Sequence, residues 1–382
     1  MPQIPRAKDK PLFTPGPLTT SQTVKQAMLR DLGSRDDEFI AIVREIRDLL
    51  LSTAGVSQKD GYEAVLMQGS GTFGIESVIA TTVPPDGKLL AVINGSYGQR
   101  IAQIAEVLNI EVGTYRTPEN ATPDPSEIDR ILTEDPSISN VAVVHCETTT
   151  GIMNPMEEIG AVVEKHGKFY FVDSMSAFGS VVFDFPGCRI DYLVSSANKC
   201  IEGVPGFSFS ICRRKALEAT QGWARSLSLD LLAQWRGLEA NGQFRFTPPT
   251  HAILAFRQAL RELEEEGGVA GRARRYGENY DTLVAGMRAM GFREYLDREL
   301  QGHIITSFCF PDDPRFTFNS FYQQLNDKGF VIYPGKVSNA DCFRIGNIGR
   351  LFKEDVTALL AAVRSTIAEM NIDLATPAVA ER

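Results

Sequence analysis

The chain has 382 residues, 43% of them hydrophobic and 23% charged, which is the balance of an ordinary globular protein of about two domains. Its 39 Lys and Arg against 48 Asp and Glu leave a net charge of −9, which argues against nucleic-acid binding because that function needs a concentrated basic surface. The four histidines and six scattered cysteines contain no HExxH spacing and no CxxC pair, so neither a metal site nor a disulfide scaffold is expected.

The N-terminal segment is polar and rich in proline. It lacks the apolar stretch of a signal peptide, and no apolar run in the chain approaches the roughly 18 residues of a membrane span. Most cysteines lie beside apolar runs, as Cys146 and Cys212 do, and we expect buried free thiols there. Together these features predict a protein of the reducing cytoplasm.

Helix-like and strand-like segments then alternate along the chain. Residues 34–53 predict a helix, because apolar side chains recur on one of its faces. Continuous apolar strands between helices are typical of a mostly parallel α/β sheet covered on both faces, whose ligands bind at the carboxyl ends of the strands. The runs that predict these strands are 62–67, 88–93, 111–115, 140–146, 168–172, 192–195 and 206–212.

The pattern changes after Thr250. Two long helices are predicted, and a small α+β domain follows them. We therefore expect three parts: an N-terminal arm (1–20), a large domain (21–250) and a small C-terminal domain (251–382). The elements predicted in the last part are helices at 251–266, 270–290 and 318–328, strands at 302–310, 331–333 and 342–345, and a final helix from Lys353.

A glycine motif follows the first predicted strand. Gly69-Ser-Gly71-Thr-Phe-Gly74 matches G-x-G-x-x-G, which would suggest NAD binding. That fingerprint also needs an acidic residue about 20 positions on, and here the next strand ends in Asn94-Gly95. The remaining interpretations are a phosphate site made by free N–H groups at a helix start, or a tight turn.

Two other strands end in residues that are costly to bury alone. One is Lys168-Phe-Tyr-Phe-Val-Asp173, and the other leads within a few residues to Lys199. A capping aspartate and a solvated lysine are the alternatives. With a phosphate site at residues 70–72, however, the two groups together suggest pyridoxal 5'-phosphate, which needs a lysine, an acid and phosphate donors.

Together with further motifs of the chain, these residues resemble the class V branch of the fold type I aminotransferases. The resemblance covers residues 12 to about 367. The resemblance implies a large domain that binds pyridoxal phosphate on a mostly parallel mixed sheet between helices, with a smaller C-terminal α+β domain. The motifs that carry it are Thr14-Pro-Gly-Pro-Leu-Thr-Thr-Ser, Gln68-Gly-Ser-Gly-Thr72, Asn94-Gly-Ser-Tyr-Gly-Gln-Arg100, His145-Cys-Glu-Thr-Thr-Thr-Gly-Ile-Met-Asn-Pro155, Val172-Asp-Ser-Met, Ala197-Asn-Lys199, Phe246-Thr-Pro-Pro-Thr-His251, Tyr333-Pro-Gly-Lys336 and Cys342-Phe-Arg-Ile-Gly346.

The resemblance also implies residue roles. Lys199 would be the Schiff-base lysine and the general base, and Asp173 would pair with the pyridinium nitrogen. Arg344 would bind the substrate anion, with the turn that contains Gly16 lying over the site. The other cofactor-binding residues implied are Ser70, Gly71 and Thr72 at the phosphate, Thr247 reaching it from the partner subunit, Tyr97 stacked on the ring where many relatives carry Trp, Thr148 or Thr150 near the ring's 3-oxygen, and Asn198. Lys336 is a weaker candidate for a second substrate cation.

Within the family, the Glu-Thr-Thr-Thr-Gly and Tyr-Pro-Gly-Lys segments favour transfer of the amino group from 2-aminoethylphosphonate to pyruvate, a step of phosphonate catabolism. The resemblance also implies a homodimer with active sites at the subunit interface. An alanine–glyoxylate or serine–pyruvate aminotransferase would share nearly every residue named. An NAD-dependent oxidoreductase would leave Lys199 and Asp173 unused. Since Lys199, Asp173 and Arg344 are all intact, a non-catalytic relative is not expected.

Overall fold

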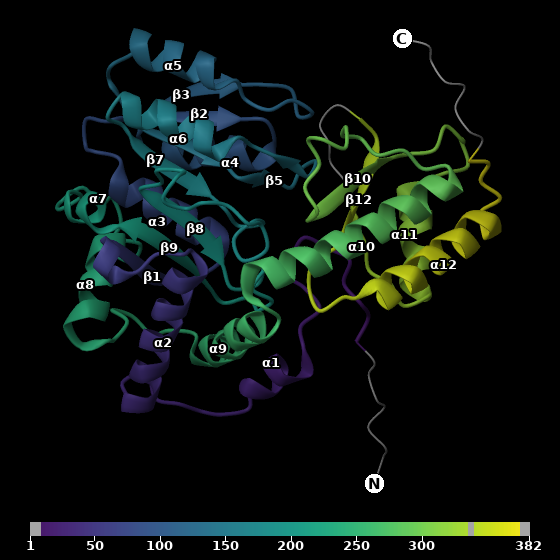
Figure 1. The fold of residues 1–382 in the computed structure, drawn as a ribbon, viewed down its shortest axis with the longest axis horizontal. Coiled ribbons are helices and arrows are strands. Elements are labelled where there is room, and N and C mark those ends of the chain that lie inside the picture. Colours follow the sequence, from purple (N-terminus) through teal and green to yellow (C-terminus); the bar gives the residue numbers. More distant parts are fainter. Residues whose placement is uncertain (1–8, 335–339, 375–382) are drawn as a thin grey trace.

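The computed structural model of the chain describes residues 9–334 and 340–374. Two bodies are visible side by side in Figure 1, one built on a large sheet and the other on a small sheet, with the long helix α10 (Gly268–Met290) running from one to the other. Among the described residues, no helix combines the length and apolar character needed to cross a bilayer.

The large sheet contains all seven strands predicted from the apolar runs, which confirms that prediction. Five adjacent strands, β8, β7, β4, β2 and β3, run parallel to one another. Strand β9 lies antiparallel between β8 and the edge strand β1, so the sheet is mixed but mostly parallel. Nearly every side chain of its five inner strands is buried, as continuous apolar strands require. The order across the sheet is β1 (Tyr62–Gln68), β9 (Phe207–Arg213), β8 (Tyr192–Ser196), β7 (Phe169–Asp173), β4 (Ile138–Val144), β2 (Lys88–Ile93) and β3 (Glu111–Arg116).

One predicted strand is too long. β4 ends at Val144, and the prediction that it continues to residue 146 is wrong. Cys146–Glu147 forms β5 of a separate hairpin with β6 (Ile152–Met153), because the chain turns back at Gly151, whose φ of +105° favours glycine. Each strand of this hairpin has only two residues, and the turn between them is polar but buried, so no extended apolar pattern indicates the hairpin.

Helices cover both faces of the large sheet (Figure 1). The predicted helix at 34–53 is observed as α2, which starts at Asp37 because the Asp36 carboxylate accepts the N–H of Glu38 and caps it. The helices of this body are α1 (Gln22–Ala27), α2 (Asp37–Thr53), α3 (Gly71–Thr82), α4 (Ser96–Val107), α5 (Pro125–Glu134), α6 (Met156–Lys165), α7 (Arg214–Glu218), α8 (Leu231–Asn241) and α9 (Thr250–Glu265).

The C-terminal body has its own hydrophobic core. Phe308, Phe343 and Ile345 of its sheet pack there with Leu283 of α10 and with Phe13 of the N-terminal arm. Its antiparallel sheet has the order β10 (Ile305–Cys309), β12 (Cys342–Gly346), β11 (Tyr333–Pro334), and its other helices are α11 (Phe318–Asp327) and α12 (Lys353–Glu369).

The apolar residues of α9, as far as Leu263, pack into the hydrophobic core of the large body. The core of the large body therefore extends beyond residue 250, whereas the division of the chain into three parts stays a prediction.

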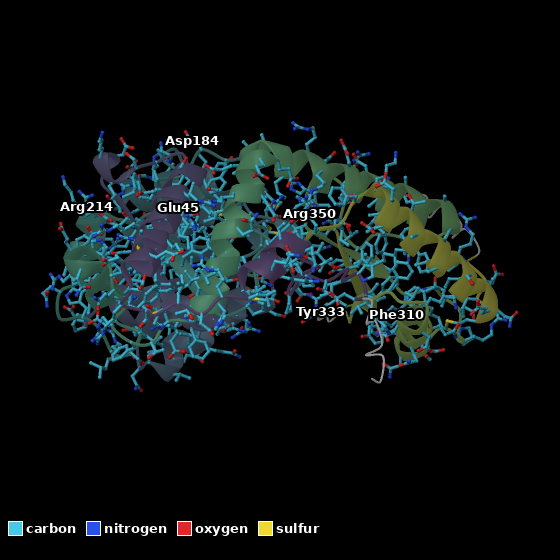
Figure 2. The ribbon with its side chains drawn as sticks, turned by 90° about the horizontal axis from the view of Figure 1, so that it is seen from below. Glu45, Asp184, Arg214, Phe310, Tyr333 and Arg350 are labelled. Carbon is cyan, nitrogen blue, oxygen red and sulfur yellow. The ribbon has the colours of Figure 1, made fainter. Side chains whose placement is uncertain are left out.

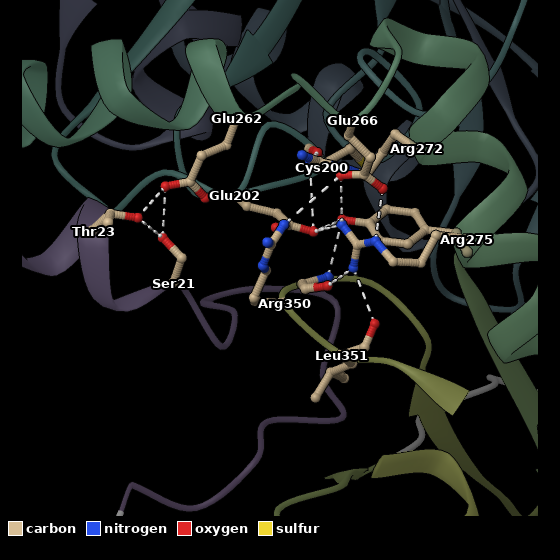
Figure 3. Close-up of polar contacts among 12 residues, drawn as sticks. Ser21, Thr23, Cys200, Glu202, Glu262, Glu266, Arg272, Arg275, Arg350 and Leu351 are labelled. Carbon is tan, nitrogen blue, oxygen red and sulfur yellow. Dashed lines mark hydrogen bonds and ion pairs between the residues drawn. The ribbon is translucent and has the colours of Figure 1, made fainter. Parts of the chain in front are cut away.

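A buried polar network joins the two bodies where α10 begins (Figure 3). The Arg275 guanidinium donates to Glu202 and Glu266, each at 2.7 Å, and to the Gly349 carbonyl oxygen at 2.6 Å. Arg272, whose side chain is fully buried, donates to the Cys200 carbonyl oxygen at 2.5 Å. The loop after β8 is thereby tied both to α10 and to the turn after β12.

Candidate active site

A cavity of about 190 Å³ lies at the carboxyl ends of β4, β7 and β8. This is where ligands bind in open α/β sheets. Its lining residues are Ser70, Gly71, Thr72, Ile75, Tyr97, Arg100, Val144, Cys146, Thr148, Asp173, Met175, Ser176, Ser196, Asn198 and Lys199.

The α3 helix starts at this cavity with free donors. Ser70 is its N-cap but its side chain makes no capping hydrogen bond, and among the described residues nothing accepts from the N–H groups of Gly71 and Thr72. A Cβ on Gly71 would lie 2.5 Å from Met175 Sδ, so glycine lets the helix begin this close to the cavity wall. Free N–H groups and the helix dipole together favour an anion here.

The neighbouring helix α4 also starts near the cavity, but its donors are already taken. The N–H of Ser96 donates to Thr149 Oγ1 at 2.9 Å, and those of Tyr97 and Gly98 donate to Glu147 Oε2 at 3.2 and 3.1 Å. Burial raises the pKa of Glu147, although these hydrogen bonds oppose the shift. The β5–β6 hairpin thus caps α4, and of the two helices only α3 offers free donors.

The Asp173 carboxylate ends β7 on the cavity wall and is buried. Its only hydrogen bond within the described chain comes from the Met175 N–H to Oδ1 at 3.0 Å. Burial therefore raises its pKa to about 7. Beside it, burial lowers the pKa of His145 to about 4, so this imidazole is neutral and pairs through Nδ1 with Ser174 Oγ at 3.1 Å.

The Lys199 side chain enters the cavity from the loop after β8. Its Nζ donates to the Pro15 carbonyl oxygen at 2.7 Å, and burial lowers its pKa. Gly16 packs directly on it: a Cβ there would lie 2.8 Å from Nζ, and its φ of +123° also favours glycine. The neighbouring Asn198 lines the cavity, and its Oδ1 accepts from Ser196 Oγ at 3.1 Å.

Arg344 approaches from β12 of the C-terminal body. It donates from Nη1 to the Thr148 carbonyl oxygen at 2.6 Å and lies 5.0 Å from the centre of the Tyr333 ring. Burial lowers its pKa. Among the described residues, the lining of the cavity includes Arg100 but not Arg344. The Arg100 guanidinium lies 5.0 Å from the centre of the Tyr97 ring. Each arginine therefore lies over an aromatic face.

Most of the predicted site residues come together around this cavity. Thr148 lines it, whereas Thr150 Oγ1 donates instead to the Glu119 carbonyl oxygen at 3.2 Å and does not. Thr247 is exposed in the loop between α8 and α9, where its carbonyl oxygen accepts from Gln68 Nε2 at 3.3 Å, and it is not part of the lining. Lys336 lies outside the described residues.

Sequence reasoning missed Arg100 and Glu147 as members of the site. Both stand inside motifs that were recognised, and Arg100 follows Tyr97 by three positions, so the two share a helix face. That spacing could have identified Arg100. Glu147 could not be identified in this way, because its partners lie on a helix distant in the sequence.

Comparison with known proteins agrees with this geometry. Residues 19–344 match the family model described as "Aminotransferase class-V". A curated relative from Salmonella schwarzengrund, named 2-aminoethylphosphonate–pyruvate transaminase, is 54% identical over 358 residues, which is 93% of this chain and 97% of the relative.

Among solved structures, the ureidoglycine–glyoxylate aminotransferase of Bacillus subtilis superposes with a TM-score of 0.88 at 23% identity, covering 96% of this chain and 94% of its own. The pyridoxamine–pyruvate aminotransferase of Mesorhizobium loti superposes with a TM-score of 0.87 at 24% identity, covering 97% and 95%. At these identities the likeness establishes the fold.

Proposed function

The chain belongs to the class V aminotransferases, and on that premise we propose that it transfers the amino group of 2-aminoethylphosphonate to pyruvate, giving phosphonoacetaldehyde and L-alanine. The observation that carries the proposal is the convergence of the Lys199 amine, the Asp173 carboxylate and the free donors of α3 on one cavity. The 54% identity to a relative of that name supports the choice of substrates.

The residues present fit pyridoxal phosphate. Asp173 is a buried carboxylate without a cationic hydrogen-bond partner in the described chain, which is what a protonated ring nitrogen requires. The free N–H groups of Gly71 and Thr72, with the Ser70 hydroxyl, suit its phosphate. Tyr97 offers an aromatic face to its ring.

When bound, pyridoxal phosphate supplies a carbonyl group that takes up the substrate amine and a ring that withdraws electrons from the carbon bearing that amine. Lys199 acts as the base that removes the proton from this carbon. A lysine accepts a proton only as the neutral amine, and the burial that lowers the pKa of Lys199 favours this form. Asn198 and Thr148 also line the cavity and add polar groups to its wall.

Arg344 orients the substrate. The amine donor has no α-carboxylate, so its phosphonate is the one anionic group that the protein can hold, and pyruvate presents a carboxylate in its place. A planar guanidinium can donate two parallel hydrogen bonds to either anion. Gly16 lies over Lys199 and narrows the entrance on this side.

We also propose that the enzyme is a homodimer of the cytoplasm in which Thr247 reaches the phosphate of the partner's cofactor. Exposed apolar side chains near the cavity support a subunit interface there: Phe73 is 52% exposed and Phe246 is 44% exposed. The two lie near one another, since Gln68 Nε2 donates to the Phe246 carbonyl oxygen and the backbone at Gly69 packs on the Phe73 ring.

A panel of donor and acceptor pairs tests the reaction. We expect alanine formation to be fastest with 2-aminoethylphosphonate and pyruvate, compared with alanine plus glyoxylate and with serine plus pyruvate. The wild type should also retain a visible absorbance band after dialysis against buffer without cofactor. Lys199→Ala should lose both activity and band, whereas the exposed-lysine control Lys215→Ala should keep both.

Faster turnover of alanine with glyoxylate would replace the proposed substrates by those of the alternative aminotransferase. A protein that binds nicotinamide nucleotides and takes up no pyridoxal phosphate would contradict the proposal altogether.

A further inference from the structure

Two cysteines of the C-terminal body face each other across its sheet. Cys309 of β10 pairs directly with Cys342 of β12, and their Sγ atoms are 4.0 Å apart. The adjacent hydrogen bond runs from the Phe310 N–H to the Asp341 carbonyl oxygen, at 2.8 Å, so the cysteines form a pair without mutual backbone hydrogen bonds. In such pairs the Cα atoms are about 4.5 Å apart, inside the range of about 4.4–6.8 Å that a disulfide spans.

Reagents can reach one member of the pair. Cys309 is partly exposed and lines a hollow of about 440 Å³ together with Arg293, whereas Cys342 is buried. The hollow belongs to the C-terminal body, and its lining includes Phe310, which follows Cys309 in the sequence and is labelled in Figure 2. The hydrogen bond with Cys342, and secondarily Arg293, hold the pKa of the Cys309 thiol at about 7 against the opposing effect of burial. A partly exposed thiol beside a cation is the reactive kind.

We propose that Cys309 and Cys342 form a reversible dithiol–disulfide site that reacts with low-molecular-weight disulfides such as glutathione disulfide. The Cys309 thiolate attacks one sulfur of the reagent, a mixed disulfide forms, and one glutathione leaves as its thiolate. The Cys342 thiolate then attacks Cys309 Sγ and expels the second glutathione. Both cysteines are oxidised, the reagent is reduced to two thiols, and the two cysteine protons pass to the departing thiolates or to solvent.

The site lies next to the arginine that we assign to substrate binding. Arg344 follows Cys342 by two positions, so both side chains lie on one face of β12, and the cross-strand partner of Arg344 is Ser307. The segment between the two cysteines contains α11 and β11. A disulfide would close this segment into a loop and hold β10 and β12 together. This effect does not depend on whether the proposed aminotransferase reaction is correct.

The experiment uses the purified holoenzyme in buffers of reduced and oxidised glutathione. After free thiols are blocked by alkylation, peptide mass spectrometry should find Cys309 linked to Cys342 in the oxidised sample and return both as alkylated thiols after dithiothreitol. Hydrogen exchange should slow at the amides of β10 and β12 on oxidation, while β1 and β9 in the same sample stay unchanged. The midpoint of thermal unfolding should rise by several degrees.

Variants separate the pair from the other thiols. Cys309→Ser should abolish the cross-link and the thermal shift, Cys342→Ser should stop at the mixed disulfide on Cys309, and Cys188→Ala, which removes a buried cysteine elsewhere, should behave as the wild type. The proposal is overturned if both thiols remain open to alkylation in the oxidising buffer, or if the wild type accumulates the mixed disulfide without closing it.

Discussion

Glu147 connects several parts of the site although it lies outside the cavity lining. Its carboxylate receives the N–H groups of Tyr97 and Gly98 and the hydroxyl of Thr149, and the next carbonyl, that of Thr148, holds Arg344. Among the described residues, its hydrogen-bond donors are backbone N–H groups and a hydroxyl, and the Arg344 guanidinium attracts its charge electrostatically. We infer that Glu147 is a positioning residue for Tyr97 and Arg344.

The variant Glu147→Gln tests this role. One oxygen is replaced by an NH2 group that faces N–H donors, and an unsatisfied buried donor costs about 1–3 kcal/mol. Pyridoxal phosphate should therefore bind roughly 5- to 150-fold more weakly, as measured by absorbance titration of the apoprotein, and KM should rise for both substrates. Glu157→Gln on the exposed side of α6 is the matched control. Unchanged cofactor affinity in Glu147→Gln would disprove the role.

Asp173 makes the stability of the apoprotein depend on pH. Its pKa is about 7 in the folded protein against 3.8 in the reference state, so between these values the folded form holds a proton that the unfolded chain has lost. The stability linked to this proton is present at low pH and is lost as pH rises through about 7.

Relative to Asp173→Asn, the wild-type apoprotein should therefore lose on the order of 2–4 kcal/mol between about pH 4 and pH 7, and nothing more above that range. Urea unfolding of both proteins across this range measures the difference. A constant difference at all pH values would show that the pKa of Asp173 in the folded protein equals that in the unfolded chain.

The positions of Lys199 and Asp173 could be predicted because each follows a recognisable buried strand whose carboxyl end faces the ligand side of the sheet. The partners of Glu147 could not, because the contacts between α4 and the β5–β6 hairpin join segments that are distant in the sequence. The choice between Thr148 and Thr150 likewise depends on which way the hairpin turns.

At the scale of elements, α10 is the member shared by the two bodies. Its first turns carry Arg272 and Arg275 into the network with Glu202 and Glu266, and its later turns pack into the C-terminal core. Seen from below in Figure 2, this helix runs across from the large body to the small one. The network also reaches the loop that carries Lys199, since the Glu202 N–H donates to the Lys199 carbonyl oxygen at 2.7 Å.

Arg275→Met should destabilise the protein by about 3–5 kcal/mol, because it removes one of the two arginines that pair with the buried Glu202 and the partly buried Glu266. Arg274→Met alters the adjacent, exposed arginine of the same helix and should change stability by less than about 0.5 kcal/mol. Denaturant unfolding compares the two. Equal losses would mean that the network contributes only as exposed ion pairs do.

The strands of the large sheet could be predicted because burial on both faces leaves a continuous apolar run. The β5–β6 hairpin could not, since each strand has only two residues and the turn between them consists of polar residues whose burial is decided by the site around them. Sequence therefore predicted the elements whose own residues form the core, and missed those defined by contacts with other segments.

For the whole molecule, the proposed homodimer makes a prediction about mixed subunits. If Lys199 of one protomer shares a site with Thr247 of the other, a dimer of Lys199→Ala with Thr247→Asp contains one site with both changes and one with neither. Mixing and reassociating the two inactive variants should then restore activity in about a quarter of the sites.

Lys199→Ala mixed with Ser70→Asp is the control, because both residues belong to the same protomer's site and no intact site can form. Restoration by both mixtures, or by neither, would disprove the shared site. Light scattering on each variant verifies that dimers form.

The N-terminal arm has a consequence for the order in which the chain matures. Phe13 packs in the C-terminal core, the Gly346 N–H donates to its carbonyl oxygen at 3.0 Å, and the Pro15 carbonyl oxygen two residues later accepts from Lys199. During synthesis we therefore expect the arm to dock only after β12 has been made, because contacts between residues so distant in the sequence form slowly. A nascent chain with a complete large sheet would then leave the Lys199 amine without the cover of the arm, so we expect that enclosure to mark the finished protein.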